Sequence, residues 1–271
     1  MSTASVTFTR HNAAHGVMWI RGALSMFRAA PFAWLLLAFS YYVLVALVQI
    51  GPWSTVGRLV GPVLKPILAV GFLAAAWTQE RGGRPRLAHL FAGFKSNLYA
   101  LVPIGIVFLT GIGAAMLATT LVDGGALLDV LSGARKLSPE LLASGVLQLS
   151  VLVGLACIVP VVLALWFAPA LVVFDDLGAI SALVTSMRAA VSNWRSMLTY
   201  AMVVITLAGM LPAIALSLLA LVNPVLGGTI AFVAMVPYGL TIVATLQISD
   251  YVSYRDVFHP NEPQAALAEA R

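Results

Sequence analysis

Charged residues are scarce in this sequence. Asp, Glu, Lys and Arg make up 9% of its 271 residues, whereas a soluble domain carries about 25%. Hydrophobic residue types make up 61%, and the mean hydropathy is +0.99. A soluble protein of this size cannot bury so much apolar surface, and a disordered chain is far more polar. The composition therefore predicts a membrane protein whose excess apolar surface is solvated by lipid.

Cysteine is almost absent, because Cys157 is the only one. A single thiol forms no intramolecular disulfide, and no group of Cys and His residues in the sequence has the spacing of a zinc site. The sequence also contains no H-E-x-x-H, Walker or G-x-S-x-G motif. We therefore expect no catalytic residue, no metal and no cofactor, and we predict that the protein is not an enzyme.

Acidic residues are outnumbered, which gives a formal net charge of +5. Such an excess can favour nucleic acid, but here the basic residues are sparse and lie beside hydrophobic segments. Lys and Arg next to membrane spans typically face anionic lipid headgroups. Membrane lipids, preferentially anionic ones, are therefore the expected partners, together with a larger membrane protein complex as a further candidate. We expect no nucleic-acid binding.

Long apolar segments are abundant. A bilayer core of about 30 Å is crossed by about 20 helical residues, and six segments reach that length. They predict an all-α membrane protein, a bundle of about six transmembrane helices in one polytopic domain over residues 1–258, followed by a polar tail over 259–271. The expected spans cover residues 32–50, 59–78, 98–122, 143–168, 197–221 and 225–249. Asn223 and Pro224 mark a tight hairpin between the last two.

The basic residues are unevenly distributed between the two sides that six spans define. Cytoplasmic loops of inner-membrane proteins are enriched in Lys and Arg, so the richer side is predicted to be cytoplasmic and to hold both termini. Eleven of the 15 basic residues fall there: Arg10, Arg21, Arg28, Arg81, Arg84, Arg86, Lys95, Arg188, Arg195, Arg255 and Arg271.

Two short matches suggest an internal duplication. Residues 28–34 (RAAPFAW) resemble residues 188–194 (RAAVSNW) at an interval of 160 residues. Residues 62–64 and 224–226 both read Pro-Val-Leu, at an interval of 162, and each match is expected to open a span. The repeat halves would cover about 16–122 and 143–258. Coincidence in an Ala- and Leu-rich chain remains the alternative.

Three amphipathic stretches precede spans one, three and five. The clearest, over 180–195, is expected to follow an N-cap at Asp176 and repeats apolar residues with helical spacing. They are Ile180, Leu183, Val184, Met187, Val191 and Trp194. The stretch with Ile20, Leu24 and Phe27 and the stretch over 87–98 follow the same plan. We expect helices along the cytoplasmic interface, either as anchors alone or as a surface for lipid or a partner. The expected contacts are Arg21, Arg28, Trp34, Lys95, Arg188, Trp194 and Arg195.

Polar residues within the spans give a second set of candidates. Lys65 lies between Pro62 and Pro66 in the second span. Its side chain either extends along lipid to the nearer headgroups or faces a solute inside the bundle. A second cluster ends the sixth span, where it forms either a structural clamp or a ligand site. Its members are Asp250, Tyr251, Tyr254 and Arg255, in which Tyr251 and Arg255 have the spacing for a cation–π contact.

Three motifs resemble an uncharacterised family of proteobacterial inner-membrane proteins. They are residues 90–94 (LFAGF), 166–170 (WFAPA) and 253–258 (SYRDVF), and the resemblance extends over most of residues 16–258. The pattern is also distantly similar to the membrane domain of bacterial glycerophosphodiester phosphodiesterases, but no segment here resembles their catalytic domain. The resemblance implies a multi-pass protein of the bacterial inner membrane. It implies no particular activity, because the family has none established.

Two functions from different classes remain in view. The first is a non-enzymatic accessory or scaffolding subunit of a membrane complex, or an organiser of nearby lipid. The alternative is a transporter or permease for a lipid-like or small amphipathic solute, which Lys65 and the kinking prolines favour. A continuous polar cavity around Lys65 would favour the transporter, and a closely packed bundle with apolar outer grooves would favour the accessory protein.

Overall fold

The computed structural model describes residues 6–50 and 54–260, and every regular element within these ranges is a helix. The predicted all-α class is confirmed. The elements are α1 (Ala14–Ala29), α2 (Pro31–Gln49), α3 (Ser54–Glu80), the 3-10 helix η1 (Leu87–Lys95), α4 (Leu98–Asp123), α5 (Ala126–Leu131), α6 (Pro139–Ala143), α7 (Val146–Trp166), α8 (Ala168–Phe174), α9 (Ala179–Ser192), α10 (Trp194–Ile205), the π-helical turn η2 (Thr206–Met210), α11 (Leu211–Val222) and α12 (Pro224–Phe258).

Six helical segments in the described ranges are long and apolar enough to cross a membrane, as predicted. They cover Pro31–Val48, Val60–Glu80, Leu98–Asp123, Val146–Phe174, Trp194–Val222 and Gly228–Phe258. The predicted hairpin is also present, since only Asn223 separates α11 from α12. Its side-chain Oδ1 accepts a hydrogen bond from Val225 N at 3.0 Å, which supplies a partner for an N–H at the start of α12.

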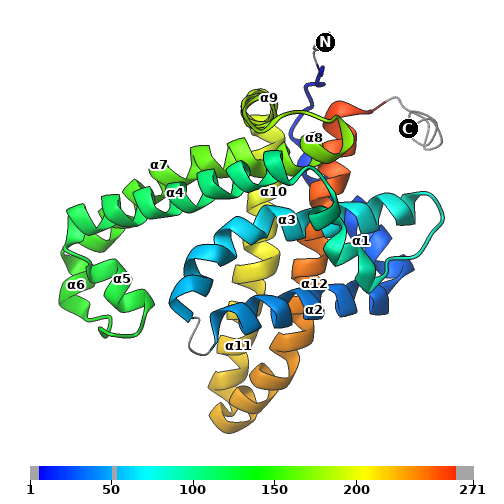
Figure 1. Ribbon diagram of the computed structural model, residues 1–271. Coiled ribbons are helices and arrows are strands. Elements are labelled where there is room, and N and C mark those ends of the chain that lie inside the picture. The colour runs from blue at the N-terminus through cyan, green and yellow to red at the C-terminus, as the bar shows by residue number, and fades with distance from the viewer. Residues whose placement is uncertain (1–5, 51–53, 261–271) are drawn as a thin grey trace.

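The spans form three hairpins that extend from one end of the molecule (Figure 1). Helix α2 pairs with α3, α4 with α7, and α11 with the first part of α12. In this view α4 and α7 run across the picture, whereas α11 and α12 run down it. The short helices α5 and α6 lie at the far end of the α4–α7 pair. The arms therefore diverge, and the bundle is close-packed only where they meet.

We call the meeting point the hub, which consists of α1, η1, α8, α9 and residues 250–258 of α12. Both ends of the described chain lie there (Figure 1), and Thr9 N donates to Val257 O at 2.8 Å. The largest fully buried side chains lie in or beside the hub. They include Trp19, Trp34, Phe72, Phe167, Tyr251 and Tyr254. In contrast, α11 has no buried residue, so the outer parts of the arms leave their apolar faces for lipid or another protein.

The stretch over 87–98 differs from the predicted amphipathic helix. It is a 3-10 helix that ends at Lys95, and Asn97 then caps α4 by accepting a hydrogen bond from Ala100 N. Gly93 explains the tight path, because a Cβ on this residue would lie 1.9 Å from the carbonyl oxygen of Ile67. Element η1 thus packs against α3 by its backbone, and the cap at Asn97 separates it from the third span.

The Pro-Val-Leu matches do not occupy equivalent positions. Pro224 begins α12, but Pro62 lies inside α3, two turns after its start at Ser54. The expected turn is therefore absent at Pro62, although this residue lies near the start of the apolar span Val60–Glu80. The longer match, over 28–34 and 188–194, contains the junctions of α1 with α2 and of α9 with α10, but the break lies at Ala30 in the first copy and at Asn193 in the second, three positions later in the match.

Candidate functional site

The last turns of α12 carry the polar centre of the hub. Successive residues of a helix point in different directions, about 100° apart, so residues 250–256 reach several neighbouring elements. Tyr251 and Arg255 are four residues apart and both reach Glu80 at the end of α3. Tyr254 faces the loop after α8, and Asp256 faces α1. The described end of the chain thus ties together helices from the whole sequence.

Glu80 is the partner that sequence reasoning missed. The Tyr251 hydroxyl donates to Glu80 Oε2, and Arg255 Nε lies 3.4 Å from Glu80 Oε1. Both members of the predicted Tyr251–Arg255 pair thus contact one carboxylate. A cavity of ≈ 390 Å³ lies beside it, between α1, α3 and α12, and includes Ser25 and Gln79 in its wall. Because Glu80 ends an apolar run and is followed by Arg81, the sequence alone favours an exposed position.

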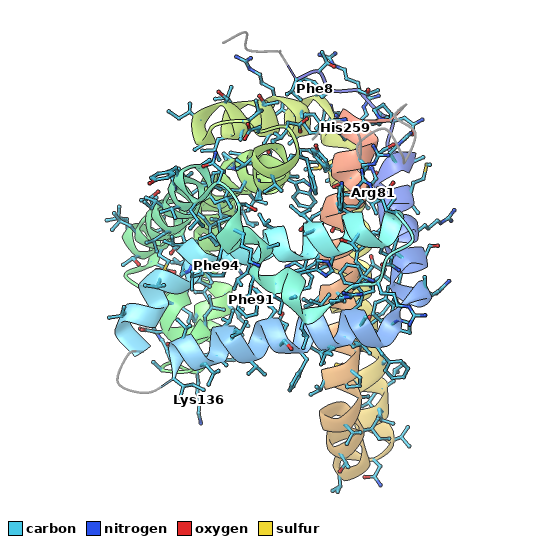
Figure 2. The ribbon with its side chains drawn as sticks, turned by 45° about the vertical axis from the view of Figure 1, so that its right-hand side comes forward. Phe8, Arg81, Phe91, Phe94, Lys136 and His259 are labelled. Carbon is cyan, nitrogen blue, oxygen red and sulfur yellow. The ribbon has the colours of Figure 1, made fainter. Side chains whose placement is uncertain are left out.

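Arg81 lies beside this group with an unusual environment. Its guanidinium carbon lies 3.6 Å from the centre of the Trp77 ring, a close cation–π contact. Its three guanidinium nitrogens are buried and make no hydrogen bond within residues 6–50 and 54–260. Figure 2 places Arg81 at the hub, near the end of α12.

Asp175 and Asp176 do not cap α9. The N-cap is Gly178, without a side-chain hydrogen bond, so the predicted cap is wrong. Asp176 has φ 54°, a left-handed conformation that Asp tolerates better than most residues. The chain thereby turns Asp175 towards α12, where its Oδ2 accepts a hydrogen bond from the Tyr254 hydroxyl at 2.6 Å and its Oδ1 lies 3.3 Å from His259 Nε2. Long-range pairing has displaced local capping.

Asp256 joins the two ends of the chain. Its Oδ2 lies 2.7 Å from His15 Nδ1 and 3.7 Å from His11 Nε2, and it accepts a hydrogen bond from Trp19 Nε1 at 2.8 Å. The main-chain oxygen of Asp256 lies 2.9 Å from His11 Nε2. The two imidazole rings stack with centres 4.0 Å apart. Sequence reasoning treated these histidines as scattered, although their spacing of four residues is typical of neighbours on a helix.

Lys65 and Asp250 line one cavity of ≈ 200 Å³, with Gln247 as the third polar side chain in its wall. The rest of the lining is apolar and includes Phe108 and Trp166. Lys65 is exposed on α3, and its Nζ lies 4.7 Å from the centre of the Phe108 ring. Neither charged side chain takes part in a salt bridge in the part of the chain that the structure describes. Lys65 therefore lies at a polar spot in an apolar cavity. Tyr251, Tyr254 and Arg255 belong to the separate hub contacts.

Six of the seven residues expected at the membrane interface are exposed. They are Arg21, Arg28, Lys95, Arg188, Trp194 and Arg195. Trp34 is fully buried instead, with its Nε1 donating to Gln79 Oε1 at 2.8 Å. Gln79 in turn donates to Met26 O. The expected interface contact of Trp34 is therefore wrong, because this polar pair seats its ring between α1, α2 and α3.

Helices α1 and α9 present opposite faces to the protein. In α1 the apolar stripe is turned inwards against α10 and α12, and Ile20 and Phe27 are buried. In α9 the buried residues are small, and Ile180, Val184 and Val191 are exposed. The prediction of an apolar face turned to lipid is thus wrong for α1, while α9 leaves such a face available.

Two of the three family-like motifs contact each other in the hub, and the third packs against α3. Trp166 Nε1 donates to Ser253 Oγ at 3.3 Å, and the rings of Phe167 and Phe258 form an edge-to-face pair with centres 5.3 Å apart. Residues 90–94 lie in η1, where Gly93 makes the close approach to α3. The motifs therefore coincide with close contacts between helices.

Comparison with known proteins shows the family to which the chain belongs. The chain is 30% identical over 256 residues to a "probable inner membrane protein" of Burkholderia thailandensis, covering 92% of this chain and 93% of that protein. No protein-family model and no solved structure matches the chain. Six apolar spans and a full-length relative lead to one conclusion: the chain belongs to the family of polytopic inner-membrane proteins that this relative represents.

Proposed function

We propose that this protein is a non-enzymatic accessory protein of the inner membrane that binds anionic lipid through α9 and serves a larger membrane complex. The observation that carries the proposal is the outward apolar face of α9. Ile180 is 79% exposed and Trp194, at the start of α10, is 56% exposed, and Val184 and Val191 are also exposed between them. A helix with exposed apolar and basic residues is typical of a membrane interface.

The inner face of α9 accounts for this orientation. Ala182, Ser186 and Ala189 are buried, and they let the helix lie close to α7. Ser186 accepts a hydrogen bond from Phe167 N and donates one to Leu163 O, both at 3.0 Å. Small residues and a fixed pair of hydrogen bonds hold one face to the protein, so the large apolar residues are left for the acyl region.

Two cations flank the outward face. Arg188 and Arg195 are exposed, and the Arg195 guanidinium lies 5.4 Å from the centre of the Trp194 ring. Each Lys or Arg near an anionic surface contributes about 1 kcal/mol. The proposed orientation puts the hub and both termini in the cytoplasm, in keeping with the distribution of basic residues. Reporter fusions at Ser2 and Arg271 test it, and a periplasmic signal from either end contradicts it.

The double variant Arg188→Glu/Arg195→Glu tests the lipid contact. The protein is solubilised gently, and the anionic phospholipid that co-purifies is measured by mass spectrometry. We expect less anionic lipid than in the wild type. The matched control is Arg135→Glu/Lys136→Glu, which reverses two charges at the other end of the α4–α7 pair; Figure 2 places Lys136 far from the hub. Equal lipid loss in both variants, or none in the first, contradicts the proposal.

A membrane partner is proposed from the diverging arms. The apolar side chains along α11 are exposed, and they include Leu211, Ile214, Leu218 and Leu221. Lipid can cover such a surface, but so can the helices of another membrane protein. Pull-down from mild detergent with mass spectrometry identifies a partner, and Leu218→Trp is expected to reduce its recovery. Loss of all co-purifying membrane proteins on dilution into fresh detergent contradicts a stable complex.

The second candidate function is transport of a small amphipathic solute. It rests on the cavity that Lys65 and Asp250 share, because opposite charges in an apolar wall suit a zwitterion. An Asp250→Cys variant in a Cys157→Ala background tests it with membrane-impermeant maleimides applied to each side. Labelling from both sides, blocked by a bound solute, favours transport. Labelling from one side alone favours the accessory protein.

A further inference from the structure

We propose that His11, His15 and Asp256 form a binding site for a divalent transition-metal ion, with zinc as the preferred ion. The site is independent of the lipid surface on α9. The ligand atoms are one nitrogen of each ring and one carboxylate oxygen, and all three lie within 4.8 Å of one another. Two histidines and one carboxylate are a set that proteins use for catalytic zinc, with a further position open to water.

The distances are close to those that a metal requires. Zinc binds histidine nitrogen at about 2.0–2.1 Å and carboxylate oxygen at about 2.0–2.2 Å, so neighbouring ligands lie roughly 3.3 Å apart. His15 Nδ1 and His11 Nε2 lie 2.7 Å and 3.7 Å from Asp256 Oδ2. Shifts of about half an ångström bring both pairs to the required separation. One imidazole must also rotate out of the stack, because the two ring planes differ by 24° and both lone pairs must point at one ion. Such shifts are within the reach of side-chain rotations.

The surroundings hold these groups in place. Trp19 Nε1 donates to the Asp256 carboxylate at 2.8 Å. Asn193 Oδ1 accepts a hydrogen bond from His11 N at 2.8 Å, and Asn193 Nδ2 donates to Thr9 O at 3.0 Å. Asn193 is itself buried between α9 and α10. Partners of this kind orient metal ligands and raise metal affinity, and here they fix both the carboxylate and the segment that carries His11.

The imidazole protons can be relocated without a net change. Beside Asp256, His15 Nδ1 faces a carboxylate oxygen and His11 Nε2 faces a main-chain oxygen, so the tautomers that make both hydrogen bonds carry the proton on these nitrogens. On metal binding the proton of each neutral ring leaves the coordinating nitrogen, and the other ring nitrogen takes one up. The freed lone pairs then bind the ion, and the carboxylate supplies the negative charge.

Access and chemistry favour zinc over other common cations. The side chains of His11, His15 and Asp256 are 10%, 22% and 26% exposed, so an ion can enter from the solvent beside the hub. Calcium and magnesium prefer oxygen ligands, whereas imidazole suits zinc and other first-row transition metals. A bound ion would bridge the start of α1 to the end of α12, which are 241 residues apart at His15 and Asp256.

Isothermal titration with zinc chloride tests the proposal. The full chain is purified in detergent with a tag that contains no histidine and is then stripped with a chelator. We expect one equivalent of zinc to bind the wild type. His15→Ala and Asp256→Asn should weaken binding by at least about 100-fold, since even loss of an outer partner costs about 10–100-fold. The matched control is His89→Ala. His89 also lies in the hub, where its Nε2 is within hydrogen-bond distance of Thr78 Oγ1, but it is not one of the three proposed ligands.

Two further measurements separate a lost ligand from a lost fold. Asp256→Asn keeps an oxygen acceptor for Trp19, and its helical content and elution volume should equal those of the wild type. Cobalt bound to the wild type should give visible absorption bands of a four- or five-coordinate ion, which His15→Ala abolishes and His89→Ala retains. Absence of stoichiometric zinc binding to the wild type, or wild-type affinity in His15→Ala and Asp256→Asn, overturns the site.

Discussion

Helices α1 and α9 carry the same short pattern and use it in opposite ways. Trp34 follows α1 and is fully buried, whereas Trp194 follows α9 and is 56% exposed. Helix α1 packs its larger apolar residues into the protein, and α9 packs alanines and Ser186 instead. An amphipathic pattern therefore predicts a helix with an apolar face and a polar face. Whether the apolar face packs against protein or lies against lipid depends on whether the other face carries small residues that can pack against the protein instead.

The difference has a structural cause in the neighbours of each helix. Helix α1 lies between α10 and α12, and Gly16 lets its backbone approach α10, where a Cβ would lie 2.3 Å from Ser196 O. Helix α9 packs against α7, α8 and α4 with its small residues, whereas Ile180, Val184 and Val191 on its outer face are exposed. The two helices therefore differ in which residues face their neighbours: large apolar residues in α1, and alanines with Ser186 in α9.

The largest expected effect on stability comes from the buried tryptophan, Trp34. Trp34→Ala should lower the free energy of unfolding by about 3–5 kcal/mol, because it opens a large cavity and removes the donor to Gln79. Thermal unfolding in detergent measures it. Trp34→Phe keeps most of the volume and should cost less. A Trp34→Ala variant as stable as the wild type would show that the α1 pattern is not part of the core.

The next effect concerns the inner face of α9. Ser186→Leu should cost about 1–3 kcal/mol of stability, because the larger side chain has no room beside α7 and both hydrogen bonds of Ser186 are lost. Ser181→Leu, on the exposed side of the same helix, is the control and should lie within about 0.5 kcal/mol of the wild type. Equal unfolding temperatures for the two variants would contradict the assignment of the faces.

A smaller effect separates the two helices as lipid-binding surfaces. Arg188→Glu/Arg195→Glu should weaken association with anionic vesicles by about 1 kcal/mol per cation removed, more if the new charges are repelled. Arg21→Glu/Arg28→Glu on α1 should weaken it less, since no apolar stripe on α1 is free to enter the bilayer beside those cations. Vesicle flotation of the reconstituted proteins measures the difference. A larger loss from the α1 pair would reverse the roles assigned to the two helices.

Local sequence patterns predicted the helices and the last hairpin. The polar contacts between residues far apart in the sequence could not be predicted from such patterns. Apolar length was sufficient for the six spans, and Asn223 with Pro224 for the last hairpin, because lipid imposes those requirements on each segment separately. The predicted cap at Asp176 failed because α9 begins only after Gly178, and the neighbouring Asp175 pairs with Tyr254, 79 residues away. Nothing local to Asp256 indicates His15, although the spacing of His11 and His15 could have been recognised as one face of a turn.

The smallest expected effect is on the exposed tryptophan. Trp194→Ala should change the free energy of unfolding by no more than about 0.5 kcal/mol, because the ring is exposed and contacts the equally exposed Arg195. We expect the Trp194 ring to contribute to membrane binding instead, because aromatic rings favour the headgroup level. The variant should therefore bind vesicles more weakly, while its unfolding temperature in detergent stays unchanged. Set beside Trp34→Ala, this variant measures the same substitution in the two environments. A destabilisation equal to that of Trp34→Ala would mean that α9 is covered by protein, and the lipid-binding role of its outer face would then be lost.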